Sequence, residues 1–297
     1  MSSIQSGRVS PSVKYDRSQG LYVPARSFTY DELAALYNQT RLDYIVPMPM
    51  NGKRMADYVQ QYDVDLDAST LSLAEDRMPR GVIMLALRED RSWITRLGLV
   101  AEQRRHKVGQ SLMEKSIENS RQRHVNRIQL EVIKGNEPAY RLFEKLGFTE
   151  IGELKVIRRP PGMPGLDIAP AVDSLTPLDA SGIQECLSLR DERVAWTEET
   201  SSLLKSRDLR GMAASLPTGE NGWLVYQYSA FELTHVALNP AVSEDMALAL
   251  LYSLHKQYPM HDTKIENVPV GHTAVPAFRA LGYLDAFSRI EMVLHLR

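Results

Sequence analysis

The chain has 297 residues, of which 43% are hydrophobic and 24% are charged, and its net charge is −2. This length suits two domains better than one, and the composition is that of a folded globular protein. The small net charge argues against a polycationic protein that binds nucleic acid. The single cysteine excludes a disulfide within the chain, and no apolar run reaches the roughly 20 residues of a membrane span. We therefore expect a cytoplasmic protein with no nucleic-acid or membrane partner.

The N-terminal half predicts a tail followed by helices and strands. Residues 1–20 are polar and lack the apolar stretch of a signal peptide, so we expect a disordered tail. Thr29 and Asp31 are residue types that cap helices, and they predict a helix over 30–40. Periodicity predicts further helices over 52–61, 108–121 and 138–146, and strands over 70–74, 82–88, 92–100, 127–133 and 148–157.

A segment rich in proline and glycine follows at 159–175. Four prolines and two glycines fall between Pro160 and Pro170. Proline lacks a backbone donor and has a fixed φ, so neither a helix nor a central strand is expected to continue here. We interpret the segment as a linker between two domains.

The C-terminal half predicts a similar order of elements. Thr176 is a capping residue type, and a helix is expected to open with Pro177 and run to residue 189. A second helix is predicted over 200–215. Strands are predicted over 222–228, 232–238, 265–270 and 290–296, and helices over 244–257 and 275–281.

Two pairs of short segments indicate an internal repeat. Residues 139-AYRLFEKLGF-148 match 274-AVPAFRALGY-283, and 97-LGLVAE-102 aligns with 235-HVALNP-240. We infer two tandem copies of one α+β fold, each with a mixed, partly parallel sheet.

The most distinctive stretch is the basic loop, 104-RRHKVG-109, between a predicted strand and a predicted helix. The first turn of a helix presents backbone N–H groups without partners and the positive end of the helix dipole, which together attract phosphate. A glycine lets the backbone approach a ligand closely. The loop is therefore a candidate pyrophosphate site, and a solvated basic surface is the alternative. A nucleic-acid patch with Arg121, Arg123, His124 and Arg127 lacks the interleaved aromatic residues of single-strand binders.

The basic loop resembles the acetyl-CoA loop of the GNAT N-acetyltransferase superfamily. Arg104 and Gly109 match the first and last positions of that loop's signature, and Lys107 replaces its first glycine. We expect Lys107 to serve if its φ stays negative. The next segment, 130-LEVIKGNEPAYRLFEKLGF-148, resembles the following block of the family, in which a strand carrying Leu-Glu-Val precedes a helix opened by Asn.

The resemblance implies that strands 92–100 and 127–133 splay apart and that the pantetheine arm of acetyl-CoA lies between them. It implies no metal. For Asn136 a helix cap is the alternative role. The residues that the resemblance implies for acetyl-CoA binding are Leu97, Leu99, Val100, Arg104, Arg105, His106, Lys107, Val108, Gly109, Gln110, Asn136 and Phe143.

For catalysis the resemblance points to Glu131 as the general base, and a strand carboxylate that faces solvent or pairs with a basic residue is the alternative. Phe143 stands where the family usually has a tyrosine, and it cannot give a proton. Tyr140 lies one helical turn earlier and is a candidate for a displaced general acid; a packing role is the alternative.

The second copy lacks the features of the basic loop. Residues 242-VSEDMA-247 align with the loop, but they carry two acidic residues and no glycine, and Gly271 aligns with Asn136. An acidic helix start repels a pyrophosphate. We expect that this copy does not bind CoA.

These observations predict an α+β protein with two tandem GNAT-like domains, one over 21–158 that binds acetyl-CoA and a degenerate one over 176–297. The predicted activity is transfer of an acetyl group to a primary amine of a small molecule or a peptide N-terminus. The alternative is a non-catalytic acyl-CoA-binding or interaction module. The chain is expected to be a monomer or a homodimer. Met48 and Met50 are candidates to line the acceptor pocket, with a core or loop role as the alternative.

Overall fold

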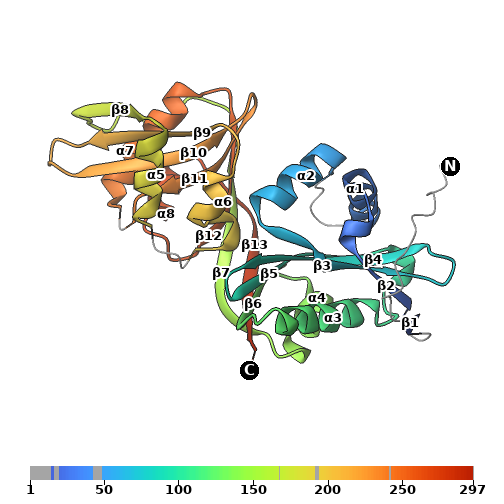
Figure 1. Cartoon of the computed structure of the whole chain (residues 1–297). Coiled ribbons are helices and arrows are strands. Elements are labelled where there is room, and N and C mark those ends of the chain that lie inside the picture. Colours follow the sequence, from blue (N-terminus) through green and yellow to red (C-terminus); the bar gives the residue numbers. More distant parts are fainter. Residues whose placement is uncertain are drawn as a thin grey trace. The chain divides into compact units, whose positions relative to one another are not determined.

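The computed structural model describes residues 15–16, 20–42, 49–166, 168–190, 194–240 and 242–296. Runs of antiparallel strands and groups of helices follow one another along the chain, which confirms the predicted α+β class (Figure 1). The described residues form two compact units. Unit 1 falls within Met1–Glu131, Glu137–Glu150 and Met292–Arg297, and unit 2 falls within Val132–Asn136 and Ile151–Glu291.

The sheet of unit 1 has the strand order β1-β2-β3-β4-β5-β6. Neighbouring strands are antiparallel except β5 and β6, which are parallel and are joined by helix α3. The strands are β1 (Tyr15–Asp16), β2 (Gly20–Pro24), β3 (Val64–Leu73), β4 (Pro79–Arg88), β5 (Arg91–Leu99) and β6 (Arg127–Ile133).

Helices cover both faces of this sheet. The helices are α1 (Tyr30–Gln39), α2 (Gly52–Gln61), α3 (Val108–Gln122) and α4 (Glu137–Lys145), with short 3-10 helices η1 (Ala25–Ser27) and η2 (Ala101–Gln103). In Figure 1, α1 and α2 lie on one side of the sheet, and α3 and α4 lie on the other. Every residue of β4 from Val82 to Ala86 is therefore buried, although alternate side chains point to opposite faces.

Local sequence explains the starts of the first two helices. Thr29 Oγ1 accepts a hydrogen bond from the backbone N–H of Glu32, and the Glu32 carboxylate accepts one from the N–H of Thr29. This capping box satisfies two N–H groups that a helix end leaves open. Asn51 caps α2 through the N–H of Arg54. Both helices therefore begin where the sequence predicts.

Unit 2 repeats this succession of elements. Its sheet has the order β7-β12-β11-β10-β9-β8. Strands β11 and β12 are parallel and are joined by α7, and the other described pairs are antiparallel. Its elements are β7 (Thr149–Arg159), β8 (Ser174–Leu178), α5 (Ala180–Ser188), η3 (Trp196–Glu198), α6 (Thr200–Leu204), β9 (Leu209–Ser215), β10 (Asn221–Tyr228), β11 (Glu232–Leu238), α7 (Glu244–Gln257), β12 (Asp262–Pro269), α8 (Val275–Ala280) and β13 (Leu284–His295).

The main core of unit 2 lies between this sheet and helices α7 and α8. Leu250, Leu251 and Leu254 of α7 are fully buried, and Phe278 of α8 packs in the same cluster. The apolar spacing in α7 therefore produces the buried face that the sequence predicts.

Three strands, β6, β7 and β13, contain residues of both units. The predicted domains 21–158 and 176–297 thus do not coincide with the compact units at their edges, and the domain division remains a prediction. The described part of the predicted linker, between Arg159 and Ser174, forms neither helix nor strand, as its prolines indicate. The predicted tail, residues 1–20, lies outside the described residues except for β1 and Gly20.

Two predicted helices of the second half are present, but one bound of each is wrong. The segment expected to open a helix with Pro177 is strand β8, and the helix α5 begins later, capped by Asp179. Strand β8 is the last in the sheet order, and an edge strand tolerates the missing N–H of proline. The helix expected over 200–215 ends at Leu204, because Leu209–Ser215 pairs with strands on both sides as β9.

Among the helices of the described residues, none combines the length and the apolar character that crossing a membrane requires.

Candidate active site

In unit 1 the parallel strands β5 and β6 pair only over their first residues. The paired residues end at Trp93 and Gln129, and we call this point the fork of unit 1. A β-bulge at Thr95 accompanies it, because two residues of β4 face three residues of β5 there. A bulge bends its strand and increases the local twist, so it turns β5 away from β6. The predicted splaying of these two strands is therefore present in the backbone pairing.

The basic loop follows β5 through the 3-10 helix η2. Arg105 and Lys107 have φ values of 65° and 60°, in the left-handed region. The condition under which Lys107 was expected to replace the glycine, a negative φ, is therefore not met. The loop adopts a backbone conformation that favours glycine, and lysine holds it at a cost of about 1–2 kcal/mol. Arg105, His106 and Lys107 are exposed, and Arg104 is half-buried.

Helix α3 begins without a side-chain cap. Its N-cap residue, Lys107, makes no capping hydrogen bond with its side chain, and the first helical bond along the chain runs from Ser111 N to Lys107 O. The N–H groups of Val108, Gly109 and Gln110 thus lie in the first turn, where the helix dipole is positive. This arrangement suits an anion, as the sequence predicts.

Gly109 lets α3 approach strand β5 closely. A Cβ atom at Gly109 would lie 3.2 Å from Leu99 Cδ1 and 3.6 Å from Leu142 Cδ2. The start of the helix is thereby held against β5. Leu97 and Leu99 of β5 are half-buried, Val100 is buried, and Val108 and Gly109 are buried behind the loop.

Side chains anchor both ends of the loop. Arg80 Nε donates to Gln103 Oε1 at 3.0 Å before the loop, and Lys145 Nζ donates to Gln110 Oε1 at 3.1 Å after it. Arg104 Nη2 lies 3.5 Å from the carbonyl oxygen of Thr40. The exposed cations of the loop are therefore carried on a fixed backbone.

Glu131 of β6 lies at the fork of unit 1. Its Oε2 accepts a hydrogen bond from Trp93 Nε1 at 2.7 Å. The roles considered for Glu131 were a general base, or a carboxylate that faces solvent or pairs with a basic residue. The partner of its Oε2 is a neutral indole. The side chain is neither fully buried nor fully exposed.

The candidate acid, Tyr140, and the predicted cofactor residue Phe143 lie on α4. Tyr140 hydrogen-bonds Glu150, and this bond raises the pKa of Tyr140 to about 12, with nearby carboxylates adding to the shift. The phenol therefore keeps its proton at neutral pH. Phe143 is buried, with its ring centre 6.1 Å from that of Phe148. Asn136 falls in unit 2, directly before α4, and its N–H donates to the carbonyl of Ile133.

Four aromatic and basic side chains near the fork were not predicted as site residues. Tyr58 OH hydrogen-bonds Thr95 Oγ1 at the bulge, and the Arg96 guanidinium lies over the rings of Tyr58 and Tyr37, 4.5 and 5.4 Å from their centres. Tyr62 packs edge-on against Trp93. The four-residue spacing of Tyr58 and Tyr62 places both on one face of α2, a signal that the sequence contained.

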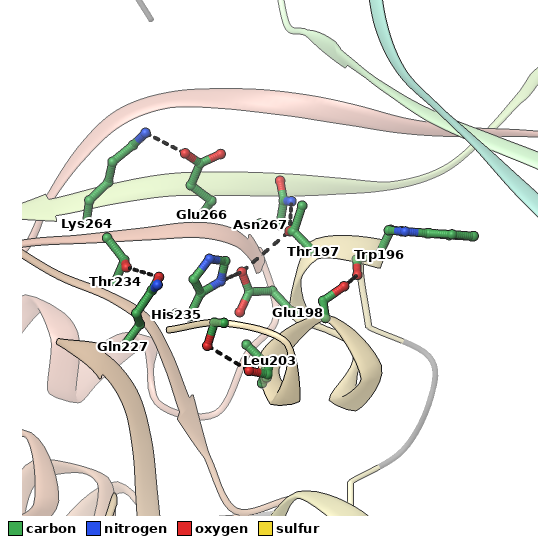
Figure 2. Close-up of polar contacts among 12 residues, drawn as sticks. Trp196, Thr197, Glu198, Leu203, Gln227, Thr234, His235, Lys264, Glu266 and Asn267 are labelled. Atoms are coloured by element: carbon green, nitrogen blue, oxygen red, sulfur yellow. Dashed lines mark hydrogen bonds and ion pairs between the residues drawn. The ribbon is translucent and has the colours of Figure 1, made fainter. Parts of the chain in front are cut away.

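The fork of unit 2 is occupied by charged side chains (Figure 2). Strands β11 and β12 stop pairing after Thr234 and Lys264, and a bulge follows at His235, whose φ is 51°. His235 Nδ1 lies 3.0 Å from Glu198 Oε1. Burial alone would lower the pKa of His235, but the Glu198 carboxylate outweighs it, and the pKa lies above its ordinary value.

Glu266 of β12 is the counterpart of Glu131. Extending the repeat alignment of 139–148 and 274–283 backwards places Glu266 under Glu131, so this signal was present in the sequence. Glu266 pairs with Lys264 and, at 2.6 Å, with Arg289 Nη2. Burial alone would raise the pKa of Glu266, but these two cations lower it to about 2. Strand pairing ends at Trp93 with Gln129 in unit 1 and at Thr234 with Lys264 in unit 2, and Gln129 and Lys264 are aligned in the repeat. Trp93 and Thr234 are therefore counterparts, so the aligned segments 97–102 and 235–240 are out of register.

The helix start in unit 2 also differs from that in unit 1. Ser243 Oγ accepts from the N–H of Met246 and caps α7, and Glu244 and Asp245 lie in its first turn. The side chain of Ser243 donates to Glu220. The N-terminus of α7 is thus capped from within the chain and carries negative charge.

Of the predicted acceptor residues, Met48 lies outside the described residues. Met50 is half-buried, and its backbone N–H and C=O both bond the Asn38 side chain, at 2.9 and 2.8 Å. Cys186 is half-buried, and burial raises the pKa of its thiol. Over the described ranges, no three or more His, Cys, Asp or Glu side chains gather to hold a metal ion.

Comparisons with known proteins agree with this geometry. Residues 33–148 match the model of the acetyltransferase (GNAT) family, and this segment contains the basic loop and Glu131. A comparison with curated proteins gives no match.

Several solved structures share the fold over nearly the whole chain. A GCN5-related N-acetyltransferase from Sphaerobacter thermophilus has 17% sequence identity and a TM-score of 0.69, covering 93% of this chain and 94% of its own. A putative acetyltransferase from Pyrococcus horikoshii has 16% identity and a TM-score of 0.63, covering 99% and 93%. A tandem GNAT protein from the clavulanic acid biosynthesis pathway has 15% identity and a TM-score of 0.63, covering 90% and 94%. The fold is therefore that of tandem GNAT structures.

Proposed function

We propose that residues 33–148, the segment that matches the GNAT acetyltransferase family, form the catalytic part of an enzyme that transfers an acetyl group from acetyl-CoA to a primary amine. The acceptor is a small molecule or a peptide N-terminus. The observation that carries the proposal is the basic loop. Its exposed basic side chains directly precede the uncapped start of α3, which follows the strand β5 that forms the fork of unit 1.

Acetyl-CoA is proposed to bind with its pyrophosphate on the N–H groups from Arg105 to Gln110. The left-handed conformations of Arg105 and Lys107 turn the loop into α3, and the helix dipole favours the negative charge. Beyond Trp93, the edge of β5 that faces β6 is no longer used for pairing in the described residues, so it is available to the pantetheine arm near Leu97 and Leu99. The hydrogen bond proposed from Asn136 to this arm remains a prediction.

The proposed chemistry needs one base and one acid. The amine nitrogen attacks the thioester carbonyl, a C–N bond forms and the C–S bond breaks. Glu131 is proposed to accept the proton that the amine loses, and Tyr140 to supply a proton to the thiolate that leaves. The phenol of Tyr140 is protonated at neutral pH, but its pKa of about 12 makes it a weaker acid than an ordinary tyrosine, and water is the other proton source for the thiolate.

Unit 2 is proposed not to bind acetyl-CoA. The capped and acidic start of α7 offers no anion site, and Glu266 with a pKa of about 2 is a weak base. The alternative function, a non-catalytic acyl-CoA-binding module, has one observation in its favour: Phe143 is buried against Phe148 and has no hydroxyl to donate.

The first test is calorimetric titration of acetyl-CoA into the whole chain. Gly109→Glu is a poor probe because its side chain would meet Leu99, whereas Lys107 is exposed. Lys107→Glu is expected to weaken binding by about tenfold or more, since it places a carboxylate at the phosphate site. Arg121→Glu is the matched control, because it makes the same charge change at the other end of α3, beyond the reach of unscreened charge.

One binding site per chain, weakened only by Lys107→Glu, supports the proposal. Equal affinities of the two variants would place the cofactor elsewhere, and two sites per chain would mean that unit 2 also binds. Amine acetylation that is lost in Glu131→Gln, with unchanged acetyl-CoA affinity, supports the enzyme. Binding without acetylation of any primary amine in a broad panel would favour the non-catalytic alternative.

A further inference from the structure

The geometry points to Trp93 as the residue that positions the carboxylate of Glu131, an inference that rests on the base role proposed above. Trp93 Nε1 donates to Glu131 Oε2 at 2.7 Å, from β5 to β6. Trp93 and Gln129 are the last described residues that pair these strands, so this side-chain bond spans the fork where backbone pairing has stopped. This side-chain hydrogen bond holds Glu131 toward β5 where backbone hydrogen bonds between the two strands no longer do.

The indole that makes this bond is itself fixed. Trp93 is only 4% exposed. Tyr62, the C-cap residue of α2, packs edge-on against it with ring centres 5.9 Å apart, and Tyr58 of α2 packs on Tyr62 at 4.9 Å. Tyr58 in turn bonds the bulge residue Thr95. A row of rings from α2 therefore sets the direction of the indole N–H, and with it the orientation of the carboxylate.

A neutral donor suits a base better than a cation does. A hydrogen bond to the ionised form holds a carboxylate in place and favours that form, but a nearby positive charge favours it much more. A base that is strongly favoured in its ionised form accepts a proton poorly near neutral pH. Trp93 therefore orients Glu131 without itself adding a positive charge beside the carboxylate.

Unit 2 provides an internal comparison (Figure 2). At the position of Glu131 it has Glu266, whose partners are the cations Lys264 and Arg289. These cations lower the pKa of Glu266 to about 2. The carboxylate thus receives a hydrogen bond from an indole in unit 1, whose helix start is uncapped, and pairs with two cations in unit 2.

The test is Trp93→Phe, which removes the N–H and keeps an aromatic ring, with Trp223→Phe as the matched control. Trp223 is a buried indole of unit 2, so its replacement has a similar packing cost within the other unit. With acetyl-CoA and an acetylated amine, Trp93→Phe is expected to lower kcat about tenfold with KM for acetyl-CoA within about twofold, and to move the acid limb of the pH profile upward. Trp223→Phe is expected to change neither.

A second measurement needs no turnover. Carbon-13 NMR of the Glu131 carboxyl in the ligand-free protein is expected to show its titration midpoint at higher pH in Trp93→Phe than in wild type. If Trp93→Phe does not fold, benzothienylalanine at position 93 keeps the indole shape and replaces the N–H by sulfur. An unchanged titration of Glu131 in a folded variant would overturn the positioning role. Full activity of Glu131→Gln would instead overturn the base role, whatever the NMR titration shows.

Discussion

Acidification from about pH 7 to about pH 5 is expected to destabilise unit 2 through one buried histidine. His255 of α7 is fully buried, and its Nε2 lies 2.8 Å from Tyr283 OH. Burial lowers the pKa of His255 to about 3, and the charge of Arg159 adds to the effect. The same side chain in the unfolded chain has a pKa of about 6.5.

The sign of the effect follows from these two values. Between about pH 6.5 and pH 3 the unfolded chain binds a proton at His255 that the folded chain does not, so the free energy of unfolding falls as the pH falls. The slope is about 1.4 kcal/mol per pH unit once the pH is well below 6.5. Between about pH 7 and pH 5 the loss due to His255 is therefore about 2 kcal/mol.

Urea unfolding followed by tryptophan fluorescence measures this loss, because Trp196 and Trp223 are buried in unit 2. The comparison is between wild type and His255→Phe, which removes the titrating group. The variant is expected to be less stable near pH 7, where Tyr283 loses its partner, and to lose about 2 kcal/mol less than wild type by about pH 5.

Tyr283→Phe is the control for the hydrogen bond alone. It removes the same contact and keeps His255, so its stability is expected to fall with pH as steeply as that of wild type. Parallel curves for wild type and His255→Phe between about pH 7 and pH 5 would refute the reasoning, since they would mean that His255 does not titrate differently in the folded state.

Two further predictions concern the backbone around the basic loop. Lys107→Gly is expected to leave the free energy of unfolding unchanged or to raise it by up to about 1 kcal/mol, because glycine adopts the left-handed conformation without strain; a larger loss in urea than for Lys107→Ala would contradict this. Gly98→Ala is expected to cost about 1–3 kcal/mol, because its Cβ would lie 2.4 Å from Oγ1 of the buried Thr40. Gly271→Ala, which meets nothing within 4 Å, is the control, and equal melting temperatures of these two variants would contradict the expected clash.

Much of the fold could be predicted because its signals are local. The helix over 52–61, the strands over 127–133 and 232–238 and the helix over 244–257 have the predicted bounds. In each case the apolar spacing and the flanking turn or capping residues agree with the tertiary environment. Where they disagreed, as at Pro177, the pairing of β8 with β9 decided the structure.

The candidate site divides in the same way. The basic loop was predicted from its charge and its place before a helix, and Glu131 was predicted from the resemblance to the GNAT family. The φ of Lys107 was not, because it is set by the turn that joins η2 to α3, and a lysine in the sequence does not indicate a left-handed conformation. The bond from Trp93 to Glu131 joins residues far apart in the sequence, so no local pattern indicates it.

The sequence by itself determined which residues form helices and strands over most of the chain, and which loop is positively charged, because those properties depend on neighbours along the chain. Only the tertiary structure decided what each fork contains. Glu131 and Glu266 occupy the same place in the repeat, yet one meets an indole and the other meets two cations. That difference arises from the strands and helices that fold against them, and it sets how each carboxylate holds a proton.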